Sequence, residues 1–380
     1  MLIFNKLLVL AKPGTKTMVH TKQSDVGEHL HEVYGHERLL SRLAASLTDG
    51  RFPHATLFVG PPGVGKQRIA IWVAQGLLCD DGPGAPCGKC QSCRQVAALG
   101  HPDLHWFIPV PRPKATDPDK QIDEARGLLA DAVADRRARP LYDRPAGTAS
   151  HALASIRLLH RIVHVRPFQG PRKAVVLGNA ERLVVQEASH EAANALLKIL
   201  EEPPADTYVM LTTSEPQSLL PTIRSRLVPV RIGGVGDETV RRFLSRELRP
   251  PPARSAMEQR LLKAEGSIGR AALARGWENG AEKAADGFLA AVQGGARRWA
   301  PLALAQAPWA ARGDFTAMLD ALALRLRAGL LKRAPLDAQG TRRIAAAIRR
   351  VEETRAAAQG NVNPQLALAV LARRLGEFAA

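Results

Sequence analysis

Hydrophobic residues follow two distinct periods along the first 235 positions of this 380-residue chain. Three short runs are almost continuously apolar, as is typical of strands buried on both faces of a parallel sheet: Leu57–Val59, Lys173–Leu177 and Tyr208–Thr213. Elsewhere a helical period predicts amphipathic helices over Tyr34–Leu47, from Ile69 onward, and over Ser155–Val165, Ser189–Glu201 and about Leu219–Arg226. This alternation predicts a doubly wound α/β fold with a parallel sheet over 31–235.

Two regions depart from this alternation. Between 109 and 150 the composition shifts to Pro, Asp, Arg and Ala, which predicts an inserted loop around one polar helix at about Ile122–Arg137. After Gly233-Gly234 no strand pattern returns, and helical periods cover 237–246, 257–264 and much of the chain beyond Gly280. We therefore expect a small all-α segment over 236–278 and an all-α bundle over 279–380.

The N-terminal residues form an apolar run that is too short to span a bilayer. This run lacks a small-residue cleavage site and is followed by Lys12 and Lys16, so we interpret 1–30 as an N-terminal extension and not as a signal peptide. Hydrophobic residues make up 46% of the chain, and none of their runs is long enough to cross a membrane. The sequence thus predicts a cytoplasmic globular protein of more than one domain.

A phosphate-binding loop, Gly60-Pro61-Pro62-Gly63-Val64-Gly65-Lys66-Gln67, follows the first predicted strand and precedes a helix. In such loops backbone N–H groups converge on phosphate oxygens at a helix N-terminus, and the lysine adds a positive charge. Gln67 stands where a Ser or Thr hydroxyl normally holds Mg²⁺, and an amide oxygen is a poor substitute. The loop predicts binding of ATP or ADP without the metal that hydrolysis requires.

The second predicted strand ends in Gly178-Asn179-Ala180-Glu181, where the usual pair of metal-holding acids is absent. Glu181 is either a metal ligand from a shifted position or a solvated glutamate at a helix start. With Gln67, this strand end leads us to expect no intrinsic ATPase activity.

All four cysteines of the chain, Cys79, Cys87, Cys90 and Cys93, lie in one short segment with Gly82, Gly84 and Gly88. Two overlapping C-x-x-C steps and one upstream cysteine make the closed ligand set of a structural Zn²⁺ site. The alternative is a pair of disulfides, which an intracellular location disfavours. A closed site keeps no position for a reacting water, so we expect the zinc to hold a loop and not to catalyse.

The formal net charge of +17 favours a polyanionic partner such as nucleic acid. The alternative is a set of solvated helix faces, because arginines are spread along the chain, as in Arg241-Arg242, Arg297-Arg298 and Arg349-Arg350, with aromatic residues at only 4%. A diffuse basic surface supports backbone contact and provides no base-reading element.

Further motifs stand beside the loop and the cysteines: His101-Pro102-Asp103, Asn194-Ala195-Leu196-Leu197-Lys198-Ile199-Leu200-Glu201-Glu202-Pro203-Pro204, and Thr222-Ile223-Arg224-Ser225-Arg226. Together they resemble bacterial sliding-clamp loader subunits of the AAA+ class, and within that family the delta-prime type of DNA polymerase III. The resemblance is clear from about Tyr34 to Ile232, weaker over 236–278, and only architectural beyond. It implies an AAA+ P-loop domain followed by a helical lid and a helical collar.

The resemblance gives Arg226 the role of an arginine finger, presented to ATP bound by a neighbouring subunit. Ser225-Arg226-Leu227 keeps the arginine of the family motif and lacks its cysteine. Thr213 matches a polar sensor at a strand end, or is an ordinary strand-end threonine. In Gly266-Ser267-Ile268-Gly269-Arg270 the arginine of a second sensor is displaced by one position, which again disfavours independent hydrolysis.

The partners that the resemblance implies are gamma/tau-type motor subunits, a delta-type subunit, the sliding clamp and primed DNA, in the nucleoid-associated replisome of the cytoplasm. The implied complex is the DNA polymerase III holoenzyme, with nucleotidyltransferase activity in another subunit. One alternative is an active gamma/tau-type motor subunit, which Gln67, Gly178 and Asn179 disfavour. Another is a zinc-containing DNA-binding repair protein, although only Lys89 and Arg94 are cations near the cysteines.

Overall fold

The computed structural model describes residues 30, 32–139, 141, 149–183, 191–273, 281, 283–306, 312–332, 338–358 and 362–379. Apart from Leu30, the predicted N-terminal extension over 1–30 lies outside these residues. So do 140 and 142–148 of the predicted insertion, 189–190 at the start of one predicted helix, and 274–278 at the end of the small helical segment.

A five-stranded sheet lies at the centre of the first 235 residues, with all strands parallel in the order β2-β3-β4-β1-β5. The strands are β1 (Ala55–Val59), β2 (Leu104–Phe107), β3 (Lys173–Leu177), β4 (Thr207–Thr213) and β5 (Val228–Arg231). The parallel sheet and the three predicted strands β1, β3 and β4 are confirmed. The edge strands β2 and β5 were not predicted.

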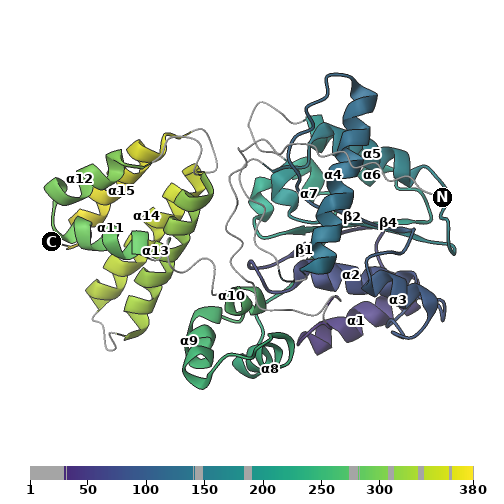
Figure 1. The fold of residues 1–380 in the computed structure, drawn as a ribbon, viewed down its shortest axis with the longest axis horizontal. Helices are drawn as coiled ribbons and strands as arrows, with labels where there is room; N and C mark the ends of the chain where they lie inside the picture. Colours follow the sequence, from purple (N-terminus) through teal and green to yellow (C-terminus); the bar gives the residue numbers. More distant parts are fainter. Residues whose placement is uncertain are drawn as a thin grey trace, which may run out of the picture.

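Helices cover both faces of this sheet (Figure 1). One group comprises α1 (Glu37–Thr48), α2 (Lys66–Leu77) and α3 (Gln91–Ala97), and the other α4 (Pro118–Ala138), α5 (Leu153–Val163), α6 (Glu191–Glu201) and α7 (Pro221–Arg224). Two 3₁₀ turns, Ala180–Leu183 and Pro216–Ser218, follow β3 and β4. The fully buried side chains Phe58, Ile69 and Met210 belong to the core between these layers.

The first helix begins three residues later than the predicted Tyr34. Gly35 and His36 have φ angles of 71° and 64°, which a right-handed helix cannot include. Tyr34 instead packs edge-on against Phe243, with ring centroids 5.1 Å apart. Tyr34 therefore joins the sheet domain to the helices that follow it.

The predicted insertion contains a helix longer than expected. Pro118 at the first position and the Asp117 side chain, which accepts the N–H groups of Asp119 and Lys120, start α4 four residues before the predicted Ile122. At the ends of the insertion, Val110 and Ser150 pair in an isolated antiparallel bridge. The α4 helix packs on α5, so this segment belongs to the helical layer.

The described residues after β5 are entirely helical or irregular. A small unit with its own core comprises α8 (Asp237–Glu247), α9 (Arg254–Ala264) and α10 (Ile268–Ala272). A separate bundle comprises α11 (Lys283–Gln293), α12 (Ala296–Leu304), α13 (Arg312–Lys332), α14 (Ala338–Ala358) and α15 (Pro364–Ala379). Figure 1 shows this bundle beside the sheet domain, with α8, α9 and α10 below.

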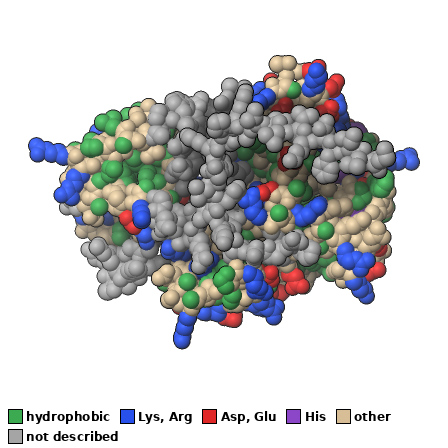
Figure 2. All heavy atoms as spheres, in the orientation of Figure 1, with side chains coloured by type: hydrophobic (Ala, Val, Ile, Leu, Met, Phe, Trp, Pro, Cys, Tyr) green, Lys and Arg blue, Asp and Glu red, His purple; other side chains and the backbone are tan. Residues whose placement is uncertain are grey.

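Basic side chains are dispersed over the surface shown in Figure 2, with acidic groups between them. On this face the described basic side chains are scattered and do not form a single stripe. Within the described part of the chain, no helix is both long and apolar enough to cross a membrane.

Candidate functional site

The phosphate-binding loop connects β1 to the N-terminus of α2, as the sequence predicted. Lys66 is buried and its ammonium folds back onto the loop. It donates to the carbonyls of Gly60 and Pro61 at 2.8 Å each and to Ser214 Oγ at 2.9 Å. An ammonium has three N–H groups, so these acceptors match its whole donor capacity. A phosphate must displace them to reach the lysine.

Gln67 occupies the place of the magnesium-holding hydroxyl in a network of amides. Its Nε2 donates to Asn179 Oδ1 at 2.8 Å, and Asn179 Nδ2 donates to Glu181 Oε1 at 3.2 Å. A Cβ added at Gly178 would lie 2.7 Å from Gln67 Oε1. The missing side chain at 178 therefore leaves the space that the longer side chain at 67 fills.

Glu181 lies in the 3₁₀ turn after β3, half-buried, and is not the fully solvated group of one sequence interpretation. His151 closes the same strand end, because its Nε2 donates to the Gly178 carbonyl at 2.7 Å. Complete burial lowers the pKa of His151 to about 4, so its ring is neutral at pH 7. The strand end that carries acids in an active site is here lined by amides, a neutral imidazole and the half-buried carboxylate of Glu181.

The small helical unit touches the phosphate loop directly. Ser267 Oγ donates to the Pro62 carbonyl at 2.9 Å, and the Gly269 N–H donates to the Gly63 carbonyl at 2.9 Å. Added Cβ atoms at Gly63 and Gly269 would come within 2.4 Å and 2.8 Å of the opposite segment. Arg270, the displaced sensor candidate, pairs with Glu265 instead. Backbone and serine, and not arginine, make this contact.

Thr213 lies at the end of β4 beside the loop, and its carbonyl accepts the Gly60 N–H at 3.3 Å. Its buried Oγ1 accepts the Glu215 N–H at 3.0 Å, which shapes the turn after the strand. The side chain that reaches Lys66 is Ser214, which sequence reasoning missed. Its position directly after the predicted strand was the available signal.

The four cysteines form one cluster, with all Sγ atoms within 4.8 Å of one another. The Cys79–Cys90 and Cys87–Cys93 Sγ pairs are each 3.9 Å apart, and all four cysteines are free, so the disulfide alternative is not realised. Tetrahedral Zn–S bonds of about 2.3 Å place two sulfurs about 3.8 Å apart. The cluster therefore has the dimensions of a four-thiolate metal site.

Hydrogen bonds around the cysteines favour the same conclusion. The Cys90 and Cys93 N–H groups point at the sulfurs of Cys87 and Cys90, at 3.4 Å and 3.3 Å. Burial raises the pKa of the Cys93 thiol above its ordinary value. Gln75 on α2 donates to the Cys93 carbonyl at 2.9 Å, which ties the cluster to the sheet domain.

Arg226 follows α7, in the helical layer that contains α6. Its Nη2 lies 2.6 Å from Glu201 Oε1, and its Nη1 donates to the Thr222 carbonyl at 2.9 Å. The side chain is 36% exposed, so the guanidinium is reachable from solvent while being held. The contact with Glu201, at the end of α6, was not predicted.

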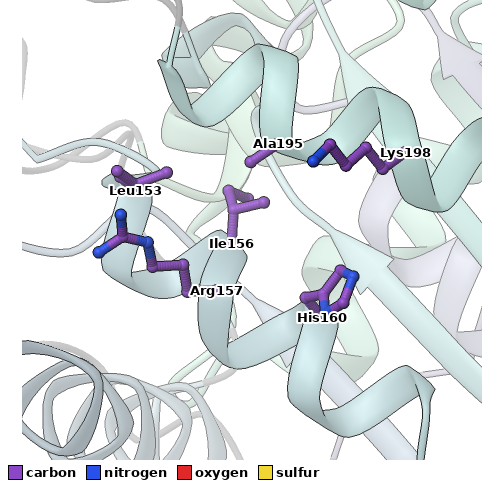
Figure 3. A pocket seen from close by; sticks show the side chains of 6 residues that line it. All are labelled: Leu153, Ile156, Arg157, His160, Ala195 and Lys198. Atoms are coloured by element: carbon purple, nitrogen blue, oxygen red, sulfur yellow. The ribbon is translucent and has the colours of Figure 1, made fainter. Parts of the chain in front are cut away.

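A shallow pocket of about 270 Å³ lies between α5 and α6 and is lined by Leu153, Ile156, Arg157, His160, Ala195 and Lys198. Figure 3 shows Arg157 and His160 on α5 and Lys198 on α6 around the apolar Ile156 and Ala195. Partial burial, together with the charges of His164 and Lys198, lowers the pKa of His160. The positive charge of the pocket therefore comes from Arg157 and Lys198 at neutral pH.

Comparison with known proteins assigns this arrangement to a family. A family model described as DNA polymerase III, delta subunit, matches residues 35–235. The DNA polymerase III subunit delta' of Pseudomonas aeruginosa is 34% identical over 216 residues, which cover 56% of this chain and 53% of that protein. The subunit tau of Salmonella typhimurium is 32% identical over 214 residues, 56% of this chain and 27% of that protein.

The chain thus spans about half the length of the delta' relative and a smaller share of tau. Among solved structures, a gamma subunit-related protein from Thermotoga maritima aligns with 74% of this chain and 97% of its own, at 17% identity and a TM-score of 0.33.

Proposed function

The chain belongs to the DNA polymerase III delta-subunit family, and on that premise we propose that it is a non-motor subunit of the delta-prime type in the clamp loader. In this role it helps an ATP-dependent assembly to load the sliding clamp onto primed DNA. The assembly operates in the cytoplasm, at the replisome. Its neighbours are motor subunits of the gamma/tau type and a delta-type subunit.

We assign three parts to this role. Residues 31–235 form the AAA+ P-loop domain, 236–278 the lid, and 279–380 the collar through which the subunits associate. The contacts of Ser267 and Gly269 with the phosphate loop support the lid assignment. The separate core of the helices α11 to α15 supports the collar assignment.

The observation that carries the non-motor role is the hydrogen bond between Gln67 and Asn179. It fills the position from which a hydroxyl and an acid hold Mg²⁺ in an active P-loop site, and amides bind this hard cation poorly. ATP or ADP remains a candidate structural ligand, bound by the loop 60–67 without hydrolysis. Such binding requires Lys66 to exchange its present acceptors for phosphate oxygens.

Arg226 contributes to catalysis on a neighbouring subunit. As an arginine finger, it stabilises negative charge on the phosphoryl group that leaves the ATP of that subunit. Its place after α7, outside its own phosphate loop and partly exposed, supports action in trans. Thr213 shapes the turn that holds Ser214 against Lys66.

The cysteine cluster would hold a structural Zn²⁺ through Cys79, Cys87, Cys90 and Cys93. The sulfur separations support this assignment, and a closed four-sulfur site stabilises its loop without supplying a reactive water.

Primed DNA is contacted in part through the pocket between α5 and α6. Arg157 and Lys198 supply the positive charges that a phosphate backbone requires.

Steady-state ATP hydrolysis tests the proposal, for the chain alone and mixed with a motor subunit, a delta-type subunit, clamp and primed DNA. We expect no turnover alone, and a loss of roughly 10³-fold in the rate at the neighbouring site when Arg226→Ala replaces the native chain. The Arg231→Ala variant, at another exposed arginine nearby, serves as the control. Turnover by the chain alone that Lys66→Ala abolishes would instead identify a working motor subunit.

A further inference from the structure

The guanidinium of Arg226 lies against two oxygens on different elements. Glu201 Oε1 on α6 lies 2.6 Å from Nη2, and the Thr222 carbonyl on α7 accepts from Nη1 at 2.9 Å. A guanidinium has five N–H groups, and among the described residues only the Thr222 carbonyl accepts a hydrogen bond from one of them. The N–H groups that face neither Thr222 nor Glu201 remain for an oxyanion outside the chain.

The carboxylate of Glu201 is poorly placed for the stability of its own helix. It is the last residue of α6, where the helix dipole disfavours negative charge. Glu202, Pro203 and Pro204 follow, and the two prolines prevent the helix from continuing. Glu201 and Arg226 are 45% and 36% exposed, and ion pairs this exposed add little to folding stability. The main physical consequence of the pair is the direction in which Arg226 points.

We propose that Glu201 is a positioning residue for the arginine finger. Its carboxylate orients the Arg226 guanidinium before a neighbouring subunit docks. The remaining N–H groups then contact the phosphoryl oxygens without a change of the Arg226 rotamer. Glu201 itself touches neither nucleotide nor metal. This inference rests on the proposed role of Arg226 in trans.

The chain offers a matched control one residue away. Glu202 is exposed, carries the same charge at the same helix end, and makes no ion pair within the described parts of the chain. Glu201→Gln and Glu202→Gln change the net charge equally and conserve side-chain shape. Only Glu201→Gln weakens the contact with Arg226.

The experiment measures kcat and KM for ATP in the full mixture of loader subunits, clamp and primed DNA. We expect Glu201→Gln to lower kcat about fivefold to tenfold, because the ion pair that orients Arg226 is lost, with KM unchanged. Glu202→Gln should match the native chain. In the Arg226→Ala background, Glu201→Gln should cause no further loss, because no guanidinium remains to be positioned.

Two results would contradict the positioning role without contradicting the finger. One is an equal kcat for the Glu201→Gln and Glu202→Gln chains, and the other is a loss of kcat on Glu201→Gln that is just as large in the Arg226→Ala background. An Arg226→Ala chain that supports native turnover would remove the finger itself. Size-exclusion chromatography of each mixture and thermal unfolding of each chain separate these outcomes from failed assembly or folding. A kcat loss that follows a loss of assembled complex would also count against the positioning role.

Discussion

At the residue scale, two substitutions that remove magnesium ligands are matched to each other in space. The long side chain of Gln67 enters the volume that a residue at 178 would fill, and its amide finds Asn179 in place of a carboxylate. A side chain at position 178 alone would therefore clash with Gln67, and a shorter side chain at position 67 alone would leave Asn179 without this hydrogen bond. The residues at 67 and 178 therefore fit each other in this structure.

This matching predicts a non-additive pair of mutations. Gly178→Ala places a Cβ 2.7 Å from Gln67 Oε1, so the amide must move and lose Asn179, at a cost of about 1 kcal/mol in unfolding free energy. In a Gln67→Thr background the same alanine should cost much less, because the shorter side chain does not reach it. Urea unfolding of the four chains measures both steps. An equal cost of Gly178→Ala in the two backgrounds would show that the positions are independent.

The sequence located the phosphate-binding loop and its departures from the ATPase pattern. It did not identify the side chains that contact Lys66 and Arg226. Gln67 and Gly178 depart from a motif whose spacing is fixed, so each is visible without coordinates. Ser214 belongs to no such motif, and Glu201 belongs to the motif that ends in Pro204 without any contact to Arg226 following from its spacing. Each acts because a strand end or a helix end brings it to Lys66 or Arg226 from far along the chain, at 148 positions in the case of Ser214.

At the element scale, the buried strands and most helices followed from periodicity, while the edges of the sheet did not. β3 has the predicted bounds because all five of its residues are buried. β2 has only four residues, and β5 contains Pro229 and exposed positions, so neither shows the continuous apolar signal of a central strand. The family resemblance drawn from the motifs is confirmed over 35–235, the part that contains this sheet.

The cysteine loop is an element whose folding we expect to depend on a bound metal ion. Its short α3 follows Cys90, which caps the helix through Sγ, and Cys93 lies one turn inside it. We expect about one zinc ion per chain by elemental analysis of the purified protein. Cys87→Ser should reduce the zinc content and lower the melting temperature, because a three-sulfur site binds the metal less tightly.

Chelation provides the complementary measurement. A strong chelator should lower the melting temperature of the native chain and leave the Cys87→Ser chain almost unchanged, since the latter has little metal to lose. Mass spectrometry under non-reducing conditions distinguishes free thiols from disulfides. A metal-free native chain with two disulfides would contradict the assignment.

At the scale of the whole molecule, a partly buried arginine links the C-terminal helical bundle to the sheet domain. Arg355 on α14 is 18% exposed and lies 2.6 Å from Asp320 on α13 and 3.3 Å from Glu215, in the turn after β4. Burial lowers the pKa of Arg355, but the charges of Asp320 and Glu215 outweigh this and raise it. The same turn carries Ser214 to Lys66, so one short segment touches both the phosphate loop and the bundle.

Removing this arginine should free the collar from the sheet domain without unfolding either. Arg355→Ala removes the contact between Arg355 and Glu215, so we expect a larger radius of gyration in small-angle X-ray scattering and faster amide exchange at 213–215. Arg374→Ala is the control, because Arg374 pairs with Glu353 inside the bundle. Unchanged scattering and exchange for Arg355→Ala would mean that the remaining contacts fix the collar. Faster amide exchange at 213–215 would show that this turn couples the C-terminal bundle to the phosphate loop.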